Sequence, residues 1–129
     1  MNQLKITLTL IFSLLLLTSH NVFAAEAVSA ATRTMAGIMI GLQHYPSDTD
    51  KGKLKALAGE ATTSAHEKTI VQVLLNLSHK PTDADKLKLA AITQDAGAPA
   101  AVKSLAGILQ HLNHQPSDAD ITALKQIAK

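Results

Sequence analysis

The residues best suited to chemistry gather in a short segment that occurs three times, with the pattern His-x-Pro-[Ser/Thr]-Asp-x-Asp. The copies begin at His44, His79 and His114, so they are 35 residues apart. Imidazole and carboxylate groups are ligands for transition metals, and imidazole also carries protons near neutral pH. The segment therefore allows two interpretations, a metal site and a structural turn between helices.

The structural interpretation concerns the residues that follow the proline. A hydroxyl in each copy can accept a hydrogen bond from a free amide of the next helix, at Ser47, Thr82 and Ser117. Three residues later an aspartate completes a capping box and favours the positive end of the helix dipole, at Asp50, Asp85 and Asp120. The proline ends the preceding helix, and the histidine can cap its free carbonyls. We expect the six hydroxyl and acidic residues to be structural caps.

The metal interpretation favours the third copy. His111 and His114 are three residues apart, as on one face of a helix, and acids follow them. Equivalent histidines in a regular stack should lie at least one helix spacing apart, about 8 to 10 Å, which is too far to share one ion. Separate weak sites for zinc, copper or nickel are therefore expected. The candidate ligands are the turn histidines and the acids of the third copy: His44, His79, His111, His114, Asp118 and Asp120.

Apolar residues around the three segments predict the elements that position them. Before the first histidine, Met35, Ile38, Met39 and Leu42 follow the i, i+3, i+4, i+7 spacing of an amphipathic helix, and the other two copies repeat this spacing. A shorter apolar pattern follows each capping residue. The sequence therefore predicts an all-α protein with six helices.

These six helices are expected to form three tandem helix-turn-helix repeats of 35 residues, at about 31–65, 66–100 and 101–129. Small residues and helix breakers at 61–64 and 96–99 are interpreted as boundaries between the hairpins. Two arrangements stay open. The hairpins form either a short open α-solenoid-like stack or a compact six-helix bundle, and for three units a compact right-handed stack is preferred.

The N-terminal segment has the features of a signal peptide. Lys5 precedes the mostly apolar run 6–18, which is too short to span a bilayer as a helix, and small residues around Ala24 suit a signal peptidase. We expect residues 1–24 to be removed and 25–129 to form one domain without a stable membrane anchor. The predicted location is the periplasm or the extracellular medium.

Composition excludes several classes of function. The chain has no cysteine, which removes disulfides, thiol catalysis and thiolate metal sites. Its 12 basic residues, one of them Lys5 in the signal segment, nearly balance 10 acidic ones, and Tyr45 is the only aromatic residue after the signal, so a nucleic-acid partner is not expected. The motifs of common enzyme families are absent, including Gly-rich phosphate loops and His-Glu-x-x-His.

Two functional hypotheses remain. The first is a non-enzymatic exported helical-repeat protein, without a cofactor, that binds an envelope protein or peptide on the surface of its stacked hairpins. The alternative is a small periplasmic metal-binding protein that uses the turn histidines and aspartates to hold zinc, copper or nickel.

Overall fold

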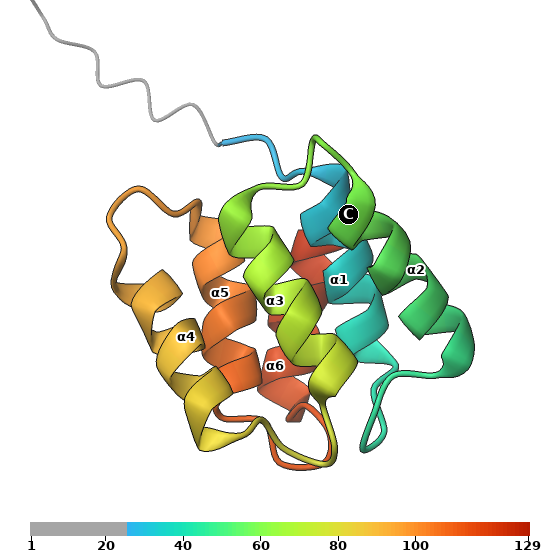
Figure 1. Ribbon diagram of the computed structural model, residues 1–129. Helices are drawn as coiled ribbons and strands as arrows, with labels where there is room; N and C mark the ends of the chain where they lie inside the picture. Colours follow the sequence, from blue (N-terminus) through green and yellow to red (C-terminus); the bar gives the residue numbers. More distant parts are fainter. Residues whose placement is uncertain (1–25) are drawn as a thin grey trace, which may run out of the picture.

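The computed structural model describes residues 26–129, so the expected signal peptide lies outside the described residues. The described part is all-helical, as predicted, and contains six α-helices and no β-strand (Figure 1). Their bounds are α1 Ala30–Ile40, α2 Asp48–Gly59, α3 Ala65–Asn76, α4 Asp83–Gln94, α5 Ala100–Gln110 and α6 Asp118–Ile127. None of these helices has the length and apolar character needed to cross a membrane.

The first, third and fifth helices form the centre of the molecule. Helices α1, α3 and α5 contact one another, and each contributes a fully buried residue at the same register position, Met35, Ile70 and Leu105. The apolar spacing seen in the sequence is therefore the core-facing stripe of each inner helix. Helices α2, α4 and α6 lie around this centre.

Each outer helix packs more extensively against the next inner helix than against the one that precedes it. The closest pairs are α2 with α3, α4 with α5, and α6 with α1. The last helix thus covers the first, and the bundle closes on itself (Figure 1). Of the two arrangements that the sequence leaves open, the described residues form the compact bundle, because an open stack would leave apolar flanks of α1 and α6 in water, whereas closure buries them.

The segments expected to bound the hairpins lie between helices that pack closely. Segments 60–64 and 95–99 join the pairs α2–α3 and α4–α5. The third close pair, α6 with α1, is formed by the two ends of the described chain. The small residues and breakers in these segments mark tight connections within pairs, which sequence cannot distinguish from linkers between units.

The loops that carry the histidines all lie at one end of the bundle. Segments 41–47, 77–82 and 111–117 each connect the end of an inner helix to the start of an outer helix, and they meet at the lower end in Figure 1. Each loop is anchored by a leucine two residues before the histidine and a proline two residues after it. These anchors are buried: Leu42, Pro46, Leu77, Pro81, Leu112 and Pro116.

Candidate metal centre

Backbone hydrogen bonds join the three loops in a closed ring. The amide of His44 donates to the carbonyl of His114, the amide of His79 donates to that of His44, and the amide of His114 donates to that of His79. All three donor–acceptor distances are 2.7 Å. This backbone ring holds the three histidines around a common axis.

Each histidine is the central residue of a tight turn with positive φ. The φ angles are 69° at His44, 66° at His79 and 69° at His114, and these are the non-glycine residues with positive φ within 26–129. In each turn the following amide donates to the carbonyl of the preceding residue, as Tyr45 does to Gln43 at 2.8 Å. An i to i+2 bond across a residue of positive φ defines the classic γ-turn, which is rare and strained.

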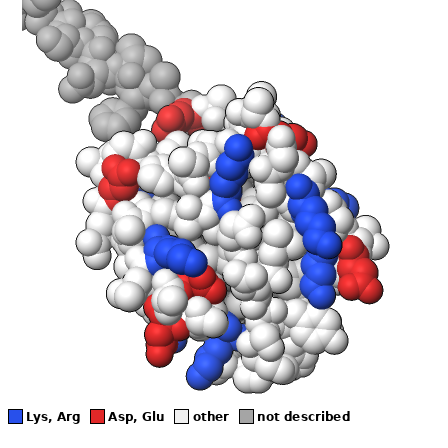
Figure 2. Space-filling view, viewed as in Figure 1, with Lys and Arg blue, Asp and Glu red and all other residues white. Residues whose placement is uncertain are grey.

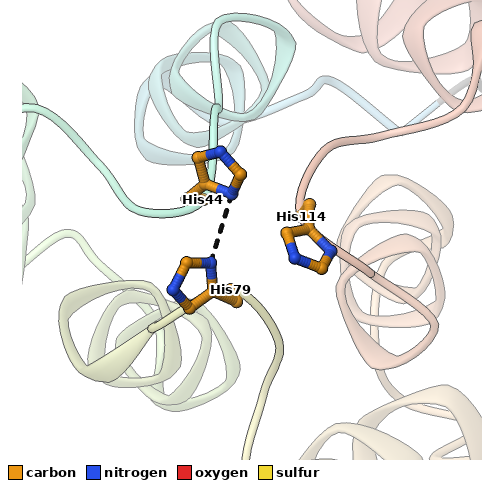
Figure 3. A group of neighbouring side chains, drawn as sticks. All are labelled: His44, His79 and His114. Atoms are coloured by element: carbon orange, nitrogen blue, oxygen red, sulfur yellow. Dashed lines mark hydrogen bonds between the residues drawn. The ribbon is translucent and has the colours of Figure 1, made fainter.

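The three imidazoles converge on this axis (Figure 3). Their ring centroids are 4.9, 5.1 and 5.2 Å apart, and each residue offers a nitrogen within 4.8 Å of those of the other two. The Nδ1 atoms of His44 and His79 are 3.2 Å apart. We call His44, His79 and His114 the histidine cluster. The expectation that equivalent histidines are too far apart to share an ion is wrong, because the helices close around an axis instead of extending along one.

The other candidate ligands of the third copy are not part of the cluster. Helix α5 ends at Gln110, so His111 and His114 do not share a helical face; His111 caps the helix, with Nδ1 2.9 Å from the carbonyl of Gly107. Asp118 and Asp120 lie in the first turn of α6. Within residues 26–129, the group of His and acidic side chains placed to share an ion consists of the histidine cluster alone.

The residues expected to cap the outer helices occupy the first turns of those helices. The hydroxyls of Ser47, Thr82 and Ser117 accept hydrogen bonds from the amides of Asp50, Asp85 and Asp120 at 3.1 to 3.2 Å. The carboxylates differ. Asp120 accepts from the amide of Ser117 and completes the box, whereas Asp85 pairs with Lys88 at 3.0 Å. The aspartates are thus engaged in helix starts and are not part of the histidine cluster.

The cluster has dimensions close to those of a zinc site. With Zn–N bonds of 2.0 to 2.1 Å and tetrahedral angles, ligand nitrogens lie about 3.3 to 3.4 Å apart. The Nδ1 atoms of His44 and His79, 3.2 Å apart, already approach this spacing, and the nitrogens of the whole group lie within 4.8 Å of one another. Nδ1 of His114 is 2.8 Å from the side-chain oxygen of Asn113. If this nitrogen carries the proton, Nε2 of His114 has the free lone pair that a metal needs.

The opposite end of the bundle has a second polar cluster, which the sequence reasoning missed. Glu67 is 3% exposed, and its carboxylate accepts from the hydroxyls of Ser29 and Thr32 and from the amide of Ser64. Burial raises the pKa of Glu67, but these hydrogen bonds outweigh it and hold the pKa below 4.5. The capping-box spacing of Ser64 and Glu67 was the available sequence signal.

A cavity of about 480 Å³ lies beside Glu67, at the N-terminal ends of α1, α3 and α5. The hydrogen bonds of Glu67 tie the start of α1 to the start of α3, so the carboxylate has a structural role. His66, the neighbouring residue, pairs with Asp95 at 2.9 Å. The histidine cluster is therefore the stronger candidate for a functional site.

Surface charge and comparisons with known proteins add no further site. Lysines and acids are scattered over the face in Figure 2 without a large patch of one sign. The chain matches no protein-family profile, and no curated protein or solved structure shows significant similarity to it.

Proposed function

We propose that this chain is an exported metal-binding protein that holds one transition-metal ion on the histidine cluster, with zinc the ion that fits best. The observation that carries the proposal is the convergence of three equivalent imidazoles on one axis, each with a nitrogen within 4.8 Å of the others. The sequence already suggested a metal-binding protein, but with separate sites and with aspartates among the ligands. In the present proposal the three turn histidines bind one ion together.

The backbone conformation supports a role for the imidazoles themselves. The backbone ring and the γ-turns use only main-chain atoms, so glycine or asparagine would form them with less strain. All three side chains are exposed, so they bury little apolar surface. Strained non-glycine residues gathered at one place are typical of functional sites.

The donor set supports zinc over other ions. Three neutral nitrogens in a trigonal arrangement suit a tetrahedral ion, whereas Cu(II) and Ni(II) favour square-planar or tetragonal geometry. Hard ions such as Mg²⁺ and Ca²⁺ prefer oxygen ligands. Copper is still the main competitor, since most nitrogen sites bind Cu(II) more tightly than zinc irrespective of geometry.

The proposal includes export of the protein and its construction from three tandem repeats. The signal-like segment 1–24 suits a small periplasmic or secreted protein. The equivalent positions of the three loops, 35 residues apart, suit three tandem repeats arranged around the axis of the cluster.

The protein-binding hypothesis has less support. Two large hydrophobic side chains within residues 26–129 are exposed, Tyr45 in the loop after α1 and Leu87 in α4. They lie on different elements and do not by themselves define a docking surface. No specific observation identifies a protein or peptide partner for them.

Isothermal titration calorimetry tests the proposal, using protein expressed with its own N-terminal segment and purified from the exported fraction. We expect one zinc ion per chain with a Kd of about 1 µM or tighter. A variant with asparagine at His44, His79 and His114 should lose this binding. The matched control, with asparagine at His66 and His111, should keep it.

Absence of zinc binding in the unmodified protein would overturn the proposal. Binding that survives in the triple variant would also overturn it, because the ion would then be held elsewhere. Parallel titrations with copper and nickel rank the ions, and intact-mass measurement of the exported protein shows whether the segment 1–24 has been removed.

A further inference from the structure

We infer that the histidine cluster is a transfer site, which passes its ion directly to an acceptor with nitrogen or sulfur donors by ligand exchange. This inference rests on the proposed function, since it concerns the ion that the cluster holds. It goes beyond binding because it states how the ion leaves and what kind of partner receives it.

The first support is an incomplete set of ligands. The cluster provides three nitrogens, and no acidic or further histidine side chain within residues 26–129 joins the group. Zinc in a tetrahedral site needs a fourth ligand. Structural zinc sites obtain all four from the protein, whereas this site leaves one position for water or for a ligand from another molecule.

The second support is access to that position. The cluster lies at the end of the bundle, and His44, His79 and His114 are all exposed. Two residues before each histidine, Leu42, Leu77 and Leu112 are buried, and no other His or acidic side chain within residues 26–129 joins the cluster from the interior. The open position of the ion must therefore face solvent, where an incoming ligand can reach it before any bond to the protein breaks.

The exchange then proceeds without redox chemistry. A neutral imidazole or a thiolate of the acceptor displaces water from the open position and forms the first new bond. The bonds from the ion to the three histidine nitrogens then break one after another, and each is replaced by a bond to the acceptor. The histidines are left neutral, and a thiol acceptor releases its proton to the solvent.

The third support is a fold that does not depend on the ion. The core is an apolar cluster of the six helices, and the backbone ring is closed by protein hydrogen bonds alone. In zinc fingers the free energy of metal binding is also the free energy of folding, so release unfolds the protein. Here release leaves the loops joined and the cluster ready for another ion.

Stopped-flow measurement of zinc transfer to the chelator 4-(2-pyridylazo)resorcinol tests the inference. We expect the observed rate to rise in proportion to the chelator concentration, because the chelator enters the open position before zinc leaves. Circular dichroism should show the same helical signal before and after transfer. The control with asparagine at His66 and His111 should transfer at the rate of the unmodified protein.

A rate independent of chelator concentration over a tenfold range would overturn the inference, because zinc would then have to dissociate before capture. Loss of helical signal on transfer would overturn it too. The calorimetry described above separates the two proposals. Without zinc binding the proposed function fails, whereas tight binding with a concentration-independent rate refutes only direct transfer.

Discussion

Replacing the three clustered histidines with alanine or with glycine tests the backbone geometry on which the site depends. Both triple variants remove all three imidazoles of the histidine cluster, so neither should bind zinc at this site. They differ in one respect, which is that alanine keeps a Cβ atom at a position of positive φ and glycine does not. We expect the glycine variant to be the more stable of the two.

The magnitude follows from the φ angles of 66° to 69°. A residue with a Cβ atom costs about 1 to 2 kcal/mol in a left-handed conformation. Glycine avoids this cost, but it destabilises the folded state by about 0.5 to 1 kcal/mol relative to alanine, because it loses more conformational entropy on folding. With the middle of each range, the difference is about 0.75 kcal/mol per position, or about 2 kcal/mol for three positions if they are additive.

Urea denaturation monitored by circular dichroism measures this difference, with EDTA present so that metal does not contribute. The substitution Gly37→Ala is a control for the difference in backbone entropy between glycine and alanine. Gly37 lies in α1, and a Cβ atom there meets no atom within 4 Å. At this helical position alanine should be the stabilising residue, by about 0.8 to 1.0 kcal/mol.

Equal stability of the two triple variants, or greater stability with alanine, would contradict a positive φ angle at these three positions. The histidines would then not occupy γ-turns with positive φ in solution. The imidazoles would then occupy an unstrained backbone, and backbone strain would no longer support a functional role for them.

Three further substitutions test the rest of the structure. Glu67→Gln removes a buried charge that accepts several hydrogen bonds and should cost roughly 1.5 to 3 kcal/mol at pH 7. Because the folded state lowers the pKa of Glu67, this stabilisation is present above pH 4.5 and is lost as the pH falls through the lowered pKa, so urea midpoints of the two proteins should converge in acid. Ser117→Ala removes the cap of α6 and should lower the free energy of unfolding by about 1 kcal/mol, whereas an unchanged urea midpoint would contradict a capping role. Leu74→Ala opens a cavity in the core beneath α3 and should cost about 2 to 5 kcal/mol, and a smaller loss of thermal stability would show that the core collapses around the missing side chain.

Much of the local structure could be predicted from the sequence because its causes are local. The spacing of Met35, Ile38 and Met39 describes one face of a helix, and the structure buries all three in α1. Ser47 and Asp50 need only to be three positions apart to cap the start of α2. These patterns depend on helical periodicity and on the free amides of the first turn.

The candidate site could be predicted only in part. The recurrence of His44, His79 and His114 identified residues worth attention, but the spacing of His111 and His114 suggested the wrong pair. That choice assumed that the helix continues through both residues. It ends at Gln110 instead, and the loop turns His114 towards the axis while His111 stays beside its own helix.

By itself, the sequence determined the number and approximate limits of the helices, their buried faces and their capped starts. Only the tertiary structure decided that α6 covers α1 and that the three loops meet in a backbone ring. An apolar stripe reports that a face is buried but not which helix buries it, so an open stack and a closed bundle have the same pattern. Because closure brings together residues 35 positions apart, the histidine cluster exists only in the closed form.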